Sequence, residues 1–255
     1  MQKAICCVPV SAMRATSSHK SEMVSQLLFG ESVSLLEKEQ EWQKVKGIYD
    51  GYEGWCPFSH LILLKRQPAF SGEPVLTAEW VNKIIWKGVP MYIPFSCDLS
   101  LIRQEDLFEE AVGFRYEGKI FHKKAGTSFP EQTEQVSRFF LNSTYLWGGK
   151  SVFGIDCSGF TQTVFRMLGK QVLRDAWQQA EQGAGVSTLS AVQPGDLAFF
   201  NNDQGRIVHV GIILASDQII HASGKVRIDT IDREGIVNLE TGERTHRLHS
   251  IKRYS

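Results

Sequence analysis

The chain has 255 residues, enough for two or three compact domains. Hydrophobic residues make up 42% and charged residues 22%, which is typical of a folded globular protein and excludes wholesale disorder. The 28 basic and 28 acidic residues cancel, and no basic stripe is present, so we expect no nucleic-acid partner and no membrane association. The most basic run, residues 246–253, is interpreted as a solvated tail.

The five cysteines indicate a reducing compartment. They form no C-x-x-C pair, so a structural zinc site or a thioredoxin-like motif is not expected. Their number is odd, and an unpaired thiol in a reducing compartment can be catalytic. The apolar run at the start is too short for a signal peptide or a membrane span. We therefore expect a cytoplasmic protein, or else a periplasmic or secreted one whose leader has been removed.

Residues 1–66 predict a small all-β barrel. Short apolar runs alternate with polar turns at the spacing of strands, and Asp50-Gly51 is a strong hairpin signal. Strands are expected at 4–10, 22–28, 32–37, 42–48 and 53–57. A barrel of about five short strands is small for independent stability unless it docks on something larger.

Residues 67–125 predict a second, diverged β unit. After a loop-like stretch, strands are expected at 89–95, 111–116 and 119–122, with a tight hairpin over 116–119. Residues 97–110 are expected to be helical or loop-like.

Residues 126–255 predict an α+β domain, with helices first and antiparallel strands after them. Apolar residues at helical spacing predict helices over 130–142, 157–168 and 175–182. Strands are expected at 196–200, 207–214, 218–221 and 226–229.

Cys157 lies at the first turn of the second of these helices, between glycines and beside polar residues. Unpaired backbone N–H groups and the positive end of the helix dipole favour a thiolate there. The same N–H groups can stabilise an oxyanion, so the position suits a nucleophile. The alternative is that Cys157 is a small buried apolar residue, as most free cysteines are.

A nucleophilic cysteine needs a base, and two histidines are placed to supply one. His209 lies in an otherwise apolar strand, and His221 follows twelve residues later on the next strand. If the strands form a hairpin, the imidazoles approach each other and His221 can orient His209. The remaining histidines lack such contexts and are interpreted as surface or packing residues: His19, His60, His122, His246 and His249. A zinc site built on Cys157 and these two histidines lacks an obvious further carboxylate ligand, so no metal is expected.

Five motifs in order resemble the NlpC-type, papain-like cysteine peptidases of bacterial cell-wall metabolism. They are Y-L-W-G-G at 145–149, G-I-D-C-S-G-F at 154–160, P-G-D-L-A-F-F at 194–200, V-H-V-G-I at 208–212 and I-I-H-A-S-G at 219–224. The N-terminal part is similar to bacterial SH3-like domains through V-S-A-M-R-A near the start, L-F-G-E at 28–31 and D-G-Y-E-G-W at 50–55. The predicted architecture is an SH3-like barrel (1–66), a diverged SH3-like unit (67–125) and a papain-like domain (126–255).

The combination resembles the γ-D-glutamyl-L-diamino acid endopeptidases, which trim free murein peptides that begin with L-Ala. The resemblance implies Cys157 as nucleophile, His209 as base, His221 as third polar residue and Tyr145 as oxyanion donor. Residues implied to hold or shape the substrate are Asp156, Ser158 and Trp147, with Glu22 and Tyr52 of the SH3-like unit as candidates for its ammonium group. Glu22 can equally be a solvated acid, and Tyr52 a packed aromatic of its hairpin.

The resemblance implies no cofactor. The alternatives are a hydrolase of intact peptidoglycan, an acyltransferase using the same thioester, and a non-catalytic cell-wall peptide-binding protein. The presence of the cysteine and both histidines argues against the last, because a degenerate copy would commonly have lost one. The preferred diamino acid and the oligomeric state do not follow from the sequence.

Overall fold

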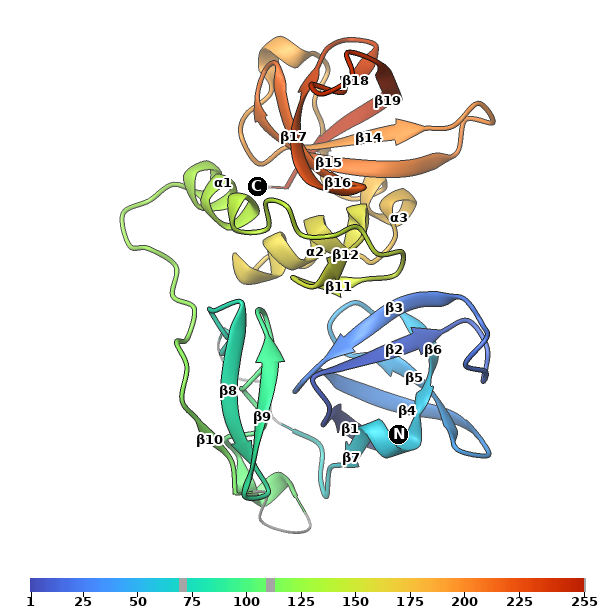
Figure 1. The fold of residues 1–255 in the computed structure, drawn as a ribbon, viewed down its shortest axis with the longest axis vertical. Coiled ribbons are helices and arrows are strands. Elements are labelled where there is room, and N and C mark those ends of the chain that lie inside the picture. Colours follow the sequence, from blue (N-terminus) through green and yellow to red (C-terminus); the bar gives the residue numbers. More distant parts are fainter. Residues whose placement is uncertain (69–72, 109–112, 255) are drawn as a thin grey trace. The chain divides into compact units, whose positions relative to one another are not determined.

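The computed structural model of the chain describes residues 1–68, 73–108 and 113–254. They form two compact units, which are described separately here (Figure 1). Unit 1 comprises Met1–His122 and Trp147–Phe153, and unit 2 comprises Lys123–Leu146 and Gly154–Ser255. Among the described residues, no helix has the length and apolar character needed to cross a membrane.

The first part of unit 1 is a seven-stranded antiparallel sheet with the order β3-β2-β6-β5-β4-β1-β7. Its strands are β1 (Lys3–Cys6), β2 (Val10–Arg14), β3 (Met23–Leu28), β4 (Ser32–Glu39), β5 (Trp42–Gly47), β6 (Glu53–Pro57) and β7 (Leu61–Leu63), with a 3-10 turn at Phe58–His60. The all-β prediction for this part is therefore confirmed. One difference is that residues 4–10 form the end of β1, a loop and the start of β2.

Alternation of side chains places one face of this sheet in a core. In β2, Ser11 and Met13 are buried while the residues between them are partly exposed. The predicted hairpin at Asp50-Gly51 joins β5 to β6, because Gly51 takes φ +71° and the Asp50 Oδ1 accepts the Tyr52 N–H at 3.0 Å.

The second part of unit 1 has three strands in the order β10-β8-β9, and here the prediction was partly wrong. The strand β8 (Val81–Trp86) was missed; it pairs with β9 (Val89–Pro94) through Lys87 and Gly88, whose φ values are +51° and +77°. The expected hairpin over 116–119 does not form, since β10 (Arg115–Tyr116) pairs with β8 instead. Residues 119–122 contribute one bridge, between Thr77 and Ile120. Residues 111 and 112 of the predicted strand 111–116 lie outside the described residues.

The segment Trp147–Phe153 packs within unit 1, although its neighbours in the chain belong to unit 2. The Lys150 ammonium is buried and pairs with the Glu31 carboxylate at 3.1 Å. The Lys150 backbone N–H donates to the Gln26 side chain at 2.8 Å. Residues Lys150–Ser151 form the short strand β11.

Unit 2 opens with three helices, close to the predicted ranges. Helix α1 (Phe129–Phe139) begins with a capping box, in which Ser128 and Glu131 satisfy each other's backbone N–H groups. Helix α2 (Cys157–Met167) is buried along its whole length, and a short helix, α3 (Ala176–Ala180), follows. Helices α2 and α3 both pack against β15 (Ile207–Ala215).

The strands of unit 2 form an antiparallel sheet with the order β13-β19-β14-β15-β16-β17-β18. Strand β18 also pairs with β19, so β14 to β19 close into a barrel. Besides β15, the strands of this sheet are β13 (Ala184–Gly185), β14 (Leu197–Asn201), β16 (Gln218–Ser223), β17 (Lys225–Ile231), β18 (Gly235–Val237) and β19 (Arg244–Arg253). The short strand β12 (Gly154–Ile155) is not part of it. The α+β arrangement of helices on an antiparallel sheet is confirmed (Figure 1).

The interpretation of residues 246–253 as a solvated tail was wrong. They belong to β19, which lies between β13 and β14 in the sheet. Most of its side chains are exposed or half-buried, and Leu248 and Ile251 supply its contacts with the core. The strand is therefore defined by its pairing with neighbours, which a polar sequence does not reveal.

Candidate active site

Helix α2 begins at Cys157 because Asp156 caps it. The Asp156 Oδ1 accepts the Gly159 N–H at 2.6 Å, as an N-cap carboxylate does. The same carboxylate is held by the buried Arg174 guanidinium, with Nη1–Oδ1 at 3.1 Å and Nη2–Oδ2 at 2.6 Å. Arg174 also donates to the Ser158 hydroxyl at 2.9 Å. These contacts fix the residues on both sides of the cysteine.

The Cys157 thiol is buried, with 5% of the residue exposed. Burial and the neighbouring Asp156 charge raise the pKa of Cys157 to about 12, against the opposing effect of the Val210 and Ser158 N–H groups and Arg174. Burial therefore favours the thiol, whereas the helix dipole favours the thiolate. A base must remove the thiol proton when the sulfur attacks.

The two predicted histidines meet on adjacent strands. Strands β15 and β16 pair antiparallel, with Gly211 opposite His221, so the predicted hairpin is confirmed. The His209 Nε2 lies 2.8 Å from the His221 Nδ1. Both rings are buried, and the Val210 N–H that bonds to the Cys157 sulfur belongs to the residue after His209. The cysteine is thus bonded to the strand that carries the first imidazole, and the first imidazole contacts the second.

His246 is a third histidine in this cluster, and its interpretation as a surface or packing residue missed this contact. Its ring stacks on His209, with the centroids 4.0 Å apart and the planes at 25°. Burial lowers the pKa of His209 well below 6.5, and His221 and His246 lower it further. Burial therefore favours the neutral form of His209, which is the form that can act as a base.

Asp229 was also missed by the sequence reasoning. On β17, its Oδ2 lies 3.0 Å from the His221 Nε2, and only 1% of the residue is exposed. Burial opposes the charge of this carboxyl, but hydrogen bonds from His221, the Leu239 backbone N–H and Arg227 outweigh it and lower its pKa to about 2. The signal in the sequence was an acid at an alternating position of a strand, V-R-I-D, which is too common to identify a site.

Tyr145 lies within the electrostatic reach of the nucleophile. Burial raises the pKa of the Tyr145 phenol to about 12, and the charges of Cys157 and Asp156 add to the effect. Its backbone N–H donates to the Gly224 carbonyl at 3.0 Å, which ties it to the end of β16. The phenol therefore keeps its proton and can donate a hydrogen bond.

The other predicted substrate residues lie in unit 1. The Trp147 indole N–H donates to the Glu22 Oε1 at 2.7 Å, and 59% of Trp147 is exposed. Tyr52 is half-buried and packs against the core of the first sheet. Glu22 and Trp147 are therefore brought together, whereas Tyr52 has the packing expected of a hairpin aromatic.

The three histidines could hold a metal ion by spacing alone, since one nitrogen of each lies within 4.8 Å of the others. The geometry does not fit zinc well. Nitrogens on a tetrahedral zinc with bonds of about 2.0–2.1 Å lie about 3.3 Å apart. The His209 and His221 nitrogens are 2.8 Å apart and use their facing positions for a hydrogen bond. The cluster is better suited to proton transfer.

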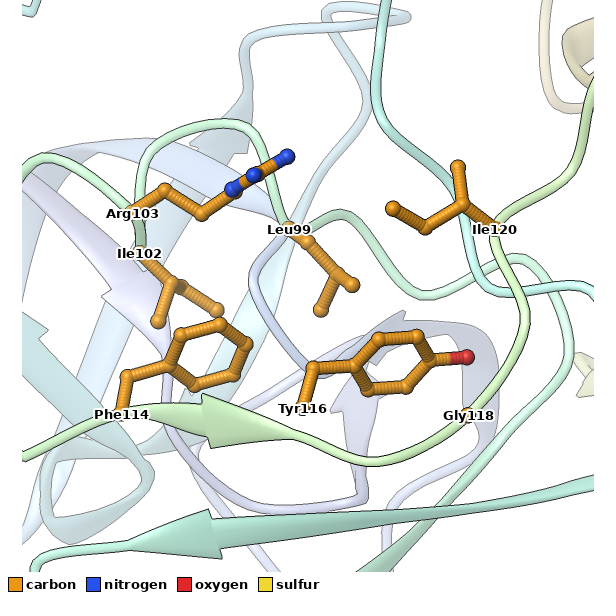
Figure 2. A pocket seen from close by; sticks show the side chains of 7 residues that line it. All are labelled: Leu99, Ile102, Arg103, Phe114, Tyr116, Gly118 and Ile120. Carbon is orange, nitrogen blue, oxygen red and sulfur yellow. The ribbon is translucent and has the colours of Figure 1, made fainter.

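A separate cavity of about 450 Å³ lies in unit 1 (Figure 2). Aromatic and aliphatic side chains form most of its wall, with the Arg103 guanidinium among them. The Tyr116 hydroxyl is already bonded to the Asn82 side chain and the Lys119 carbonyl. None of the residues lining this cavity is a cysteine or a histidine. The cavity is lined by Leu99, Ile102, Arg103, Phe114, Tyr116, Gly118 and Ile120.

Comparison with known proteins matches two segments of the chain to family models. The model of the NlpC/P60 family matches residues 142–244, and that of the bacterial dipeptidyl-peptidase Sh3 domain matches residues 13–61. Two relatives are both named gamma-D-glutamyl-L-lysine dipeptidyl-peptidase. The Bacillus subtilis protein is 31% identical over 78% of this chain and 71% of its own. The Bacillus cereus protein is 26% identical over 91% of this chain and 77% of its own.

The fold is shared with a solved structure. An NlpC/P60 family protein from Bacillus cereus superposes with a TM-score of 0.75 at 20% sequence identity, covering 99% of each chain. The predicted fold, papain-like with SH3-like β structure before it, is therefore confirmed.

Proposed function

Because the chain belongs to the NlpC/P60 family of cysteine peptidases, we propose that it hydrolyses the γ-D-Glu–diamino acid bond of free murein peptides that begin with L-Ala. The names of the two relatives support the choice of bond, since both are named gamma-D-glutamyl-L-lysine dipeptidyl-peptidase and are similar over most of the chain. The observation that carries the proposal is the 2.8 Å contact between His209 and His221, beside a buried cysteine at the start of a helix.

In the proposed reaction, His209 takes the Cys157 thiol proton as the sulfur attacks the γ-carbonyl carbon of D-Glu. The tetrahedral intermediate collapses to a thioester, and the protonated His209 gives its proton to the departing α-amine of the diamino acid. Water, activated by His209, then adds to the thioester and releases the dipeptide acid. His221 holds the His209 ring throughout.

The oxyanion of each tetrahedral intermediate needs hydrogen-bond donors. We assign this role to the Tyr145 phenol and the backbone N–H at the start of α2. Support comes from the raised pKa of Tyr145, which keeps the phenol a donor, and from its proximity to the charge of Cys157. Asp156 and Ser158 are held by Arg174 and shape the adjoining pocket.

For the substrate's free amine we propose Glu22, with Tyr52 as a second contact. The Trp147 indole holds one carboxylate oxygen of Glu22, which orients the acid while leaving its negative charge in place. A carboxylate paired with an α-ammonium group would favour peptides with an unblocked L-Ala over strands within the intact wall.

The test is mass spectrometry of products from L-Ala-γ-D-Glu-L-Lys and its diaminopimelate counterpart. Wild type should release the diamino acid, and Cys157→Ala should release none while keeping its circular dichroism spectrum. Cys56→Ala is the matched control, because that thiol is also buried but lies in unit 1. Release of the diamino acid by Cys157→Ala at the wild-type rate would refute the mechanism.

Two further substrates test the specificity. An N-acetylated tripeptide should be cleaved poorly, and equal rates would rule out the proposed amine site at Glu22 and Tyr52. Purified sacculi should remain intact, and their solubilisation would indicate a hydrolase of polymeric wall instead. An acyltransferase would be revealed by transfer of the dipeptide to added amines.

We place the reaction in peptide recycling within the cytoplasm. The odd number of cysteines and the adjacent Cys6 and Cys7 favour free thiols, which supports a reducing compartment. Cell fractionation with an antibody against the chain tests this, and recovery from the medium or the wall would contradict it.

A further inference from the structure

A single line of hydrogen bonds joins three side chains on three neighbouring strands. The His209 Nε2 faces the His221 Nδ1 at 2.8 Å, and the His221 Nε2 faces the Asp229 Oδ2 at 3.0 Å. The three residues lie on β15, β16 and β17, which pair in that order. All three are at least 95% buried, so solvent does not compete for these hydrogen bonds.

Each contact in the line fixes where a proton must lie. A carboxylate can only accept, so the His221 Nε2 carries a proton and donates it to Asp229. In a neutral His221 the Nδ1 is then unprotonated and accepts from the His209 Nε2–H. That leaves the His209 Nδ1, its other ring nitrogen, unprotonated and able to take the thiol proton.

We propose that Asp229 is a positioning residue that sets the tautomers of both histidines and so leaves the His209 Nδ1 as the base. The inference rests on the proposed roles of Cys157, His209 and His221. It adds a fourth member to that set, one that acts through His221 and does not touch the substrate.

The surroundings of Asp229 explain why His221 is needed as a donor rather than as a counter-ion. The Arg227 guanidinium already balances the carboxylate, with its Nε 2.8 Å from the Oδ2 and its Nη2 3.0 Å from the Oδ1. The Leu239 backbone N–H donates to the Oδ1 at 2.9 Å. The carboxylate therefore needs from His221 only a hydrogen-bond donor.

The same surroundings make Asp229→Asn a sharp perturbation. The fixed Leu239 N–H and the Arg227 Nη2 both donate to the Oδ1 position, whereas the Arg227 Nε near the Oδ2 has no hydrogen-bond partner among the described residues. The asparagine oxygen is therefore expected at the Oδ1 position. Its NH2 group then faces His221 and donates to the Nε2. The line inverts: His221 donates from Nδ1, His209 accepts at Nε2, and the His209 Nδ1 holds a proton where the thiol needs a base.

Asp229→Ala does not invert the line, because alanine offers no donor and the histidines can keep either tautomer. Positioning by tautomer therefore predicts that the isosteric Asn variant is the less active of the two. A merely structural role predicts the opposite order, since Asn preserves the volume and polarity that Ala removes. Asp232→Asn is the matched control: that acid pairs with Arg244 in the turn after the same strand but contacts no histidine.

The experiment measures kcat and KM for the four full-length proteins on L-Ala-γ-D-Glu-L-Lys, with 15N NMR of the imidazoles. We expect kcat of Asp229→Asn to fall by about 10³-fold or more, as when a histidine base is held in the wrong tautomer. Asp229→Ala should keep more activity than Asp229→Asn. The KM of Asp229→Asn should differ from the wild-type value by less than about threefold, and Asp232→Asn should match wild type in both parameters. The spectra should show Nε2–H for His209 and His221 in wild type and Nδ1–H in Asp229→Asn.

Unchanged tautomers in Asp229→Asn, or more activity in Asn than in Ala, would overturn the inference. The NMR result decides the matter alone if the Ala variant does not fold. Failure of the proposed function can be distinguished from failure of this inference. In that case wild type would leave the tripeptide uncut, or Cys157→Ala would still cut it. The imidazole spectra would still report on Asp229.

Discussion

Breaking the buried ion pair between Arg174 and Asp156, the residue before the nucleophile, should strongly destabilise unit 2. Arg174 is 1% exposed and makes three hydrogen bonds, two to Asp156 and one to Ser158. The substitution Arg174→Met keeps an apolar side chain in the space but removes the guanidinium. Asp156 is then left as a buried carboxylate without the cation that balances it.

Removing one partner of a buried pair costs about 3–5 kcal/mol, because the other charge stays buried. With a urea dependence of about 2 kcal/mol per M, the unfolding midpoint of unit 2 should fall by about 2 M. In Arg174→Met/Asp156→Asn the carboxylate is gone, while asparagine still caps α2. The double variant should therefore recover most of the loss.

The assay must separate the two units, and tryptophan provides the means. Of the six tryptophans, Trp177 alone belongs to unit 2. Labelling with 5-fluorotryptophan gives its 19F resonance as a report on unit 2 and the other five as reports on unit 1 during urea titration. A loss below about 1 kcal/mol in Arg174→Met, or a double variant less stable than both single ones, would refute the reasoning.

Two other expectations concern catalysis. A Cβ at Gly211 would lie 2.9 Å from the His221 Cβ, so Gly211→Ala should displace the His221 ring. We expect kcat in the tripeptide assay to fall by about 10- to 100-fold. A wild-type kcat would contradict the steric argument. Because the pKa of His209 is held well below 6.5, kcat/KM should stay level as the pH falls through 6.5 and should drop only at lower pH, where the base becomes protonated. An inflection at pH 6.5 in a pH–rate profile would contradict the burial argument.

The sequence was most informative where chemistry restricts the residues. Cys157, His209 and His221 were identified from their motifs and from strand alternation, and the structure places both histidines on paired strands as expected. A thiol at a helix start and a histidine in an apolar strand are uncommon enough to stand out.

Residues whose position depends on strand pairing were missed. His246 contacts His209 because β19 lies between β13 and β14 in the sheet. The sequence of β19 has few apolar residues and therefore does not predict a strand. Asp229 reaches His221 through the register of β16 and β17, in which Arg227 lies opposite His221. The β8–β9 hairpin was missed because its turn, Lys87-Gly88, puts a lysine at positive φ where Asn or Asp is usual.

The order of the histidines and Asp229 on neighbouring strands has a consequence for how this chain can change in length. The turn at Ser216 and Asp217 joins β15 to β16, and loss of one residue there would shift the pairing by a single step. A one-residue shift turns every side chain of a strand to the opposite face, so His221 would leave His209 altogether. Insertions and deletions can accumulate in the exposed stretch 241–243 between β18 and β19, whereas the length of the turn before His221 is constrained by the chemistry itself.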